Sequence, residues 1–408
     1  MLYRFEFANV YSFADPQVLD LRIGAAVPDE PGRFAPVWPG SAERAPKVVA
    51  LFGANASGKS NVLRAAAFLA GFVANSFRFS PELPLPVRWF QGEPPHGSLR
   101  MAAEFGGPAQ PNGPPGEFCG YRYEVELADR QTEPAKATLS PTVVRHEALF
   151  YHPPGAARRR RLFIRDPGGQ VTAAPEFGLS RLHVALQRIL RPDASVISTL
   201  AQLNHAFAAQ LVQAARKTGG NIQLEQMEPN DDAVARYLAD NPSSLKRLNQ
   251  DLEQVDLGIL EMHIVQGPSG PTQAFRHAGL SGSLLSTFES HGTRRFVRLH
   301  PLIAQTLETG GIALIDELDQ ALHPVVLAEV VRWFHDPERN PHNAQLWMTC
   351  QSPALLDELR KEEVFLCEKD PQGRSRVYGL RDIQGVRRDE NLARNYLGGV
   401  YGAVPHLG

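Results

Sequence analysis

Cysteine is scarce in this 408-residue sequence, which contains only Cys119, Cys350 and Cys367. These residues are far apart, odd in number and lack metal-ligand spacing, so we expect no disulfide framework and no zinc site. Long apolar runs are also lacking. The sequence contains no stretch of about 18 apolar residues, the length needed to span a bilayer. Its first residues do not resemble a secretory signal. We therefore expect a cytoplasmic protein with no membrane partner.

An excess of charge of one sign is lacking too. The 42 Lys and Arg residues are balanced by 44 Asp and Glu residues, which leaves a formal net charge of −2. Proteins that bind nucleic acid constitutively are often strongly basic, so this balance gives no support to that class. The basic run Arg158–Arg161 could contact phosphates, although a solvated loop is the simpler interpretation.

What the sequence does have is ordinary globular composition and an alternating pattern of strands and helices. Apolar residues make up 43% of the chain, enough for a large core. Towards the C-terminus, strand patterns alternate with helical ones, which predicts a parallel sheet covered by helices. The Pro/Gly-rich segment 106–116 is interpreted as a surface loop. The expected strands are a hairpin within 1–23, then 48–52, 119–127, 143–151, 258–266, 311–316, 344–349 and 363–368, and the expected helices lie within 180–215, 231–256, 293–308, 321–335 and 353–361.

A phosphate loop follows the apolar strand 48–52. Residues 53–60 fit G-x-x-x-x-G-K-[ST] in full, and a helical pattern comes directly after them. Glycines let the backbone N–H groups point at phosphate oxygens, and the helix N-terminus adds a favourable dipole. Lys59 is expected at the β- and γ-phosphates and Ser60 on Mg²⁺. The predicted nucleotide-binding residues here are Gly53, Ala54, Asn55, Ala56, Ser57, Gly58, Lys59, Ser60 and Asn61.

Two adjacent acids end the apolar strand 311–316. Carboxylates resist desolvation unless they are paired or bound to metal, so Asp316 is predicted to hold Mg²⁺. Glu317 is predicted to orient or deprotonate the attacking water. By itself Glu317 could equally be a charge at a helix N-terminus, but a phosphate loop in the same chain favours the catalytic interpretation. The two motifs predict ATP and Mg²⁺ as cofactors and ATP hydrolysis as the activity.

A Ser-x-Gly segment precedes the helical pattern that leads into the acidic strand. Ser290, Gly292 and Thr293 match the signature motif of ABC-type ATPases, which faces the γ-phosphate held by a second subunit. An upstream segment, Leu280–Ser283, resembles the signature even more closely. We prefer 290–293, because the helix that follows this segment leads directly into the acidic strand. A simple helix cap by Ser290 or Thr293 is the alternative.

Three further positions complete the candidate site. Asp319 lies where ABC-type proteins place the loop that crosses the dimer interface. Gln351 follows the strand 344–349, where related proteins usually have a histidine at the γ-phosphate. Glutamine keeps a donor but carries no charge, so we expect slow or partner-dependent hydrolysis unless Gln351 is only a polar turn residue. For the glutamine of the usual Q-loop, Gln91 is a weak candidate.

These motifs together resemble the compact ABC/SMC-like AAA ATPases of bacteria, the RloA/AriA-like group. The resemblance extends from residue 2 to the C-terminus. It rests on the segments Asn9–Phe13, Glu289–Arg295, Leu314–Pro324 and the tail Tyr396–Pro405. It implies an α/β fold: an ABC-type P-loop NTPase head with a mixed or parallel sheet, an N-terminal antiparallel β-subdomain and an inserted helical lobe.

The same resemblance implies a division of the chain into three parts. Residues 1–170 would form the N-terminal part of the head, with the phosphate loop and the β-subdomain. Residues 171–257 would form the inserted helical lobe, and residues 258–408 the C-terminal part of the head, with the signature and the acidic strand.

For function, the resemblance implies an ATPase that pairs with itself around ATP, as a homodimer or higher oligomer. Its expected role is the sensor or regulator of an anti-phage defence system that controls a partner effector, a TOPRIM-like nuclease, through which nucleic acid would be contacted. An SMC-like DNA repair or maintenance ATPase also fits the motifs, although the near-neutral charge and the lack of heptads argue against it. An ATP-gated scaffold with little hydrolysis is a third interpretation.

Overall fold

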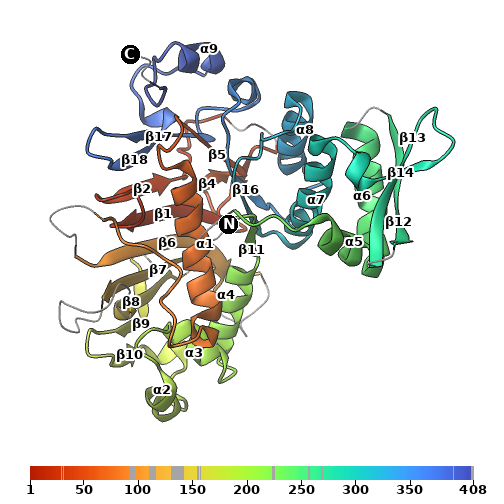
Figure 1. Ribbon diagram of the computed structural model, residues 1–408. Coiled ribbons are helices and arrows are strands. Elements are labelled where there is room, and N and C mark those ends of the chain that lie inside the picture. The colour runs from red at the N-terminus through yellow and green to blue at the C-terminus, as the bar shows by residue number, and fades with distance from the viewer. Residues whose placement is uncertain are drawn as a thin grey trace.

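The computed structural model describes residues 1–28, 30, 32–91, 97–109, 116–129, 142–153, 156, 158–222, 226–255, 258–267, 270–388 and 390–405. Two large sheets dominate this part of the chain, one mostly parallel and one antiparallel (Figure 1). Among the described residues, no helix combines the length and apolarity that crossing a membrane requires. The predicted α/β architecture, with a mostly parallel sheet and an N-terminal antiparallel β-subdomain, is confirmed.

The six-stranded sheet carries the predicted phosphate loop and acidic strand. Its strand order is β11-β15-β16-β5-β17-β18, and all neighbours are parallel except β17 and β18. Every residue of β5 and β16 is buried, as expected for strands covered on both faces. The carboxyl ends of β5, β15 and β16 therefore meet at one edge. The strands are β5 (Val48–Phe52), β11 (Thr218–Gly220), β15 (Ile312–Ile315), β16 (Gln345–Thr349), β17 (Val364–Lys369) and β18 (Ser375–Gly379).

The seven-stranded sheet is antiparallel throughout and has the order β10-β9-β8-β7-β6-β1-β2. Its inward side chains share one core with helix α1 (Lys59–Asn75) and with residues of the parallel sheet such as Leu51 and Trp347. The hairpin expected within residues 1–23 is present as β1 and β2. The strands are β1 (Leu2–Ala8), β2 (Gln17–Asp20), β6 (Leu99–Pro108), β7 (Phe118–Asp129), β8 (Thr142–His152), β9 (Arg160–Arg165) and β10 (Val171–Ala173).

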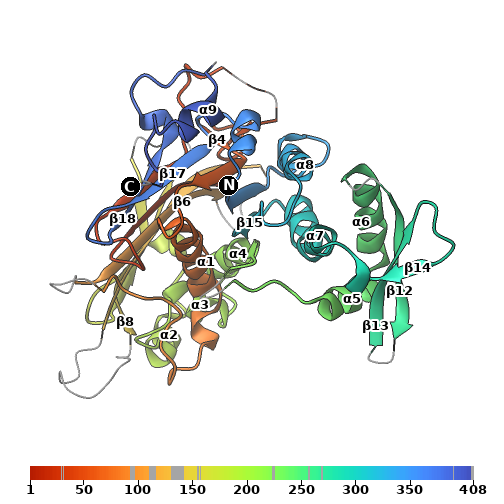
Figure 2. The ribbon, with the colours of Figure 1, turned by 45° about the horizontal axis from the view of Figure 1, so that its top comes forward.

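A second lobe lies beside helices α7 (His291–Thr309) and α8 (Pro324–His335), on the right of Figures 1 and 2. It consists of two helices and a three-stranded antiparallel sheet. A second core cluster joins its apolar side chains to α7, α8 and the other face of the parallel sheet. Its elements are α5 (Asp231–Asp240), α6 (Pro242–Val255), β12 (Ile259–Gly267), β13 (Gly270–His277) and β14 (Ser283–Leu285).

Helices α2 (His183–Ile189), α3 (Val196–Ala201) and α4 (Ala206–Arg216) lie elsewhere: α3 and α4 pack against α1, and α2 packs against α3. The segment predicted as one inserted lobe, 171–257, is thus found in two places in the molecule. Its boundaries as a domain stay a prediction.

Three local expectations need correction. The basic run Arg158–Arg161, interpreted as a solvated loop, ends inside β9, where Arg160 and Arg161 pair with β8. The helix expected at 353–361 is a short 3₁₀ helix, η4 (Pro353–Glu358). In the segment 106–116, predicted as a loop, residues 106–108 are the end of β6 and pair with β7, while residues 110–115 lie outside the described residues. Pairing with a neighbouring strand prevails here over the loop preference of Gly and Pro. The remaining strands are β3 (Phe34–Pro36) and β4 (Arg44–Pro46), and the remaining α-helix is α9 (Leu392–Leu397). Further short 3₁₀ helices are η1 (Ser76–Arg78), η2 (Pro175–Phe177), η3 (Ser286–Phe288) and η5 (Leu380–Asp382).

Candidate functional site

The predicted phosphate loop connects β5 to α1, which begins at Lys59. Gly53 and Gly58 have φ angles of 148° and 110°, a region that favours glycine. A Cβ atom on Gly53 would come within 2.3 Å of the carbonyl oxygen of Cys367. The Lys59 ammonium donates hydrogen bonds to the carbonyl oxygens of Gly53 (2.7 Å) and Ala54 (2.9 Å). Burial lowers the pKa of this ammonium, a shift that a bound anion would oppose.

The phosphate loop and the acidic strand meet through their side chains. The Ser60 hydroxyl donates to Asp316 Oδ1 at 2.8 Å, although the two residues are 256 positions apart. Thr349, at the end of the intervening strand β16, donates to the same oxygen at 2.7 Å. The Asp316 side chain is thereby fixed between the ends of β5 and β16, and an oxygen-rich corner forms at the edge of the sheet.

Glu317 follows Asp316 in a left-handed backbone conformation, with φ of 52°. Its N–H donates to the Thr349 hydroxyl at 2.7 Å. Non-glycine residues in this region are uncommon and gather at functional sites, where surrounding contacts hold them. The sharp turn directs the chain away from the strand directly after the two acids.

Asp319 contacts the loop after β16 in its own chain. Its Oδ2 atom accepts the backbone N–H groups of Gln351 and Ser352, both at 2.8 Å. The structure thus places two predicted site residues, Asp319 and Gln351, side by side near Glu317. Contact of Asp319 with a second subunit stays a prediction.

Asn221, which the sequence analysis did not identify, braces the backbone of Asp316. Its carboxamide accepts the Asp316 N–H at 2.7 Å and donates to the Asp316 carbonyl at 3.1 Å. The buried guanidinium of Arg295, on α7, also donates to that carbonyl (3.3 Å) and to Gln320. Helix α7 is therefore tied directly to the acidic strand end.

Asn221→Ala is expected to lower Mg²⁺-dependent ATP turnover about tenfold, because the buried Asp316 N–H loses its acceptor and the Asp316 carbonyl keeps only its longer bonds, such as the one from Arg295. A matched control exists in the second lobe, where Asn249 makes the same pair of bonds to the backbone of Met262. Asn249→Ala should destabilise the protein similarly and leave turnover within about twofold. Melting temperatures and phosphate-release rates of both variants check this expectation. Equal losses of turnover would contradict it.

The Ser-x-Gly segment begins helix α7, as its position in the sequence predicted. Ser290 is the N-cap residue, and its hydroxyl accepts the Thr293 N–H at 3.1 Å. Gly292 packs so closely on the turn after the acids that an added Cβ would lie 2.4 Å from the Ala321 carbonyl oxygen. The competing segment Leu280–Ser283 is exposed, ends in the first residue of β14 and begins no helix.

Gly292→Ala is expected to reduce ATP turnover at least tenfold, because the added methyl group must displace either the start of α7 or the backbone at Ala321. Gly282→Ala in the competing segment is the control, since a Cβ there meets no atom within 4 Å. Steady-state phosphate release by both variants tests which segment matters. A loss in the Gly282 variant alone would assign the signature to the other segment.

A cavity of about 610 Å³ lies beside the phosphate loop. Tyr11, Ser12 and Gln91 line it, as do Asn61 and Arg64 from α1. Asn61 donates to the Ser12 hydroxyl at 2.9 Å, which links the N-terminal motif to the first turn of α1. Phe13, from the same N-terminal motif, is fully buried in the core and does not line the cavity. Arg88 and Trp89 also line the cavity. The sequence analysis identified neither these two residues nor Arg64, because no motif connects them to the phosphate loop.

The donors at the edge of the sheet fit Mg²⁺. Ser60 and Asp316 offer a hydroxyl and a carboxylate oxygen, the hard ligands that Mg²⁺ takes together with substrate phosphates and water. Within the described ranges, no group of three or more His, Cys, Asp or Glu side chains could hold a metal by itself.

Comparison with known proteins gives a family and a set of distant folds. A family model described as "AAA domain, putative AbiEii toxin, Type IV TA system" matches residues 48–357. Similar solved structures include the SMC head domain from Thermotoga maritima, with 15% identity, a TM-score of 0.43 and coverage of 93% of this chain and 98% of that chain. Another is an Smc head domain with an extended coiled coil, bound to the C-terminal domain of ScpA, from Pyrococcus furiosus. It has 11% identity, a TM-score of 0.46 and coverage of 98% and 99%. The search of curated proteins gave no match.

Proposed function

We propose that this chain, which belongs to the family described as "AAA domain, putative AbiEii toxin, Type IV TA system", is an ATPase whose nucleotide site is completed by a second copy of itself. The single observation that carries the assignment as an ATPase is the contact of Ser60 with Asp316. It joins a complete phosphate loop to an acidic strand end, and these are the two parts that P-loop NTPases use to hold a nucleotide with Mg²⁺.

The residues divide the chemistry among them. The N–H groups of the loop and the start of α1 would bind the phosphates, and Lys59 would leave the carbonyl groups of Gly53 and Ala54 for the β- and γ-phosphates. Ser60 and Asp316 would hold Mg²⁺, which neutralises charge that develops on the phosphate oxygens. Glu317, held by Thr349, would accept a proton from the attacking water.

The second copy would contribute Ser290, Gly292 and Thr293. In this chain α7 begins with a capped Ser-x-Gly turn, a natural site for an anion. The same helix contacts the backbone of Asp316 through Arg295. A nucleotide that binds at the start of α7 would therefore also affect Asp316 and Glu317 of the chain that contributes this helix.

The biological role that we propose is regulation of a partner effector in anti-phage defence, with a TOPRIM-like nuclease as the partner. Two points support it: the family description names a toxin–antitoxin system, and the sequence motifs resemble the RloA/AriA-like ATPases. ATP-driven pairing would hold the effector, and hydrolysis would release it.

The test is the oligomeric state and phosphate release of the purified chain. With ATP and Mg²⁺ the apparent mass in analytical ultracentrifugation should double, and with ADP it should return to that of the free chain. Phosphate release should rise more than linearly with protein concentration, because the active form is a pair. Hydrolysis that is strictly proportional to protein concentration, with no change in mass, would contradict the shared site.

A further inference from the structure

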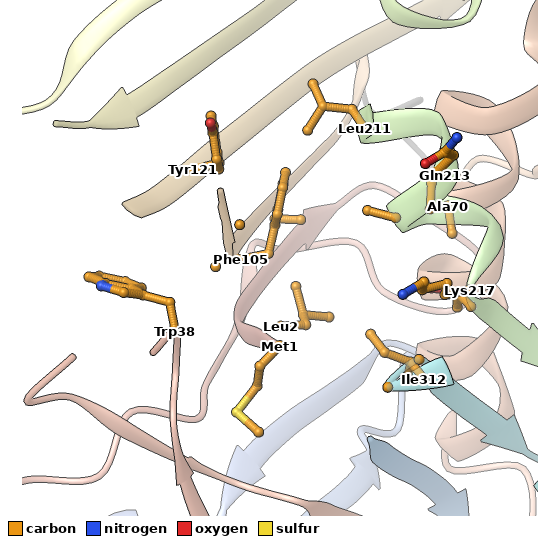
Figure 3. Close-up of a pocket in the computed structure, with 18 of the residues that line it drawn as sticks. Met1, Leu2, Trp38, Ala70, Phe105, Tyr121, Leu211, Gln213, Lys217 and Ile312 are labelled. Atoms are coloured by element: carbon orange, nitrogen blue, oxygen red, sulfur yellow. The ribbon is translucent and has the colours of Figure 1, made fainter. Parts of the chain in front are cut away.

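A second cavity, of about 570 Å³, lies away from the phosphate loop and between the two large sheets. One wall comes from the antiparallel sheet, with Leu2 on β1 and Phe105 on β6. The opposite wall comes from Ala70 on α1 and Leu211 on α4, and Ile312 at the start of β15 forms part of the floor (Figure 3). This volume lies within the range of about 300–1,000 Å³ found for small-molecule sites.

The walls are mainly apolar and include aromatic rings. Trp38, Phe105 and Tyr121 stand along one side, as Figure 3 shows. The rings of Phe105 and Tyr121 are stacked, with centroids 5.7 Å apart. Trp38 is only partly buried, on the segment between β3 and β4, so one side of the cavity is open to solvent. Such walls favour a ligand with a flat apolar body.

The charge around the cavity is of one sign. Among the described residues that line it there is no Asp or Glu, whereas Lys217 is present. The Lys217 ammonium points from the end of α4 towards the interior of the cavity (Figure 3). It donates one hydrogen bond, to the Thr309 carbonyl oxygen at 2.8 Å, and an ammonium has three donors. An anionic group near Lys217 would therefore gain a cation and meet no opposing carboxylate.

We infer that this cavity binds a small amphipathic anion: a flat apolar body between the two sheets, with one acidic group at Lys217. The site is separate from the nucleotide site, and its occupation does not depend on ATP chemistry. It is also placed to influence that chemistry. Ala66 and Ala70 lie on the same helix as Lys59, and Ile312 begins the strand that leads to Asp316. A molecule that fills the cavity would contact both elements at once.

Two fluorescent probes of nearly the same shape test the inference on the full chain. 1-Anilinonaphthalene-8-sulfonate has an apolar aromatic body and one negative charge, and N-phenyl-1-naphthylamine has the same body without the charge. We expect saturable binding of the sulfonate at one molecule per chain. Lys217→Gln should weaken it about tenfold and leave the uncharged probe within about twofold, because only the charged probe uses the ammonium.

Matched variants distinguish probe binding in the cavity from non-specific probe binding to the protein surface. Arg216→Gln removes the neighbouring exposed cation, which does not line the cavity, and should change neither probe. Ala70→Phe should exclude both probes by filling the space, and Leu397→Ser, which removes an exposed apolar side chain elsewhere, should have no effect. Lys217 is exposed, so its replacement is informative even if Ala70→Phe lowers the melting temperature. Equal weakening by the Lys217 and Arg216 variants, or probe binding at many sites per chain, would overturn the inference.

Discussion

Glu317→Gln is expected to lower the rate of ATP hydrolysis by about 10²–10⁴, the usual contribution of a positioned general base. Glutamine has nearly the same shape but cannot accept a proton at neutral pH. The backbone bond from residue 317 to Thr349 does not involve the carboxylate, so the left-handed turn should persist. ATP binding should remain, and the variant should accumulate as an ATP-bound pair.

Single-turnover phosphate release, together with analytical ultracentrifugation in ATP, measures both effects. Glu338→Gln changes an exposed glutamate at a distance from the site and should behave as the unaltered protein does. A Glu317→Gln chain that hydrolyses ATP at the normal rate would remove Glu317 from the role of base. Loss of nucleotide binding in the same variant would assign it a binding role instead.

Lys59→Ala is expected to weaken ATP binding by roughly 100-fold or more, because charge-assisted bonds to phosphate are lost from a buried position. The substitution also frees the carbonyl groups of Gly53 and Ala54, which accept from the lysine. A modest loss of thermal stability without nucleotide is therefore expected. The larger effect should be the disappearance of the stabilisation that ATP gives, since a ligand raises stability only in proportion to its binding.

Isothermal titration with a non-hydrolysable ATP analogue, combined with melting curves at increasing analogue concentration, measures this loss. Lys369→Ala, at an exposed lysine on β17, is the control for removal of one positive charge. If the Lys59 variant bound the analogue as tightly as the control does, the triphosphate would lie elsewhere.

The sequence predicted the parts of the site that are continuous along the chain. The phosphate loop, the acidic strand end and the start of α7 all follow local patterns, and the structure brings the first two into contact. The family match also agrees with the motif-based resemblance to an AAA-type ATPase. Local patterns predict such elements because glycine turns, helix caps and buried strands are set by nearby residues.

The residues that brace the site could not be predicted in this way. Asn221 contacts Asp316 across 95 positions, and the segment around it carries no motif. Thr349 is the last residue of an apolar strand, and a threonine at such a position is not a distinctive pattern. Only the order of the sheet places it against Asp316. Arg88 and Trp89 reach the cavity beside the phosphate loop from a Pro-rich segment. Such contacts depend on tertiary arrangement, which periodicity does not encode.

Parts of the fold also depend on tertiary contacts that local sequence patterns do not predict. Strand β6 was missed because two glycines and a proline end it, and its pairing with β1 and β7 outweighs their local preference. The helical patterns within 171–257 were expected to form one lobe. The distribution of α2–α4 and α5–α6 between two cores depends on contacts with α1 and α7, which lie outside that segment.

Mixing two inactive variants tests the shared site most directly. Lys59→Ala disables the phosphate loop and Gly292→Ala disables the signature, so each alone should hydrolyse little ATP. A mixed pair would keep one intact site, built from the loop of the Gly292 variant and the signature of the Lys59 variant. Equal mixing should restore a clear part of the normal rate, up to about half if every pair is mixed, since each mixed pair keeps one of two sites. Mixed pairs that form, as shown by differently labelled chains, yet restore no hydrolysis would contradict a site shared between two copies.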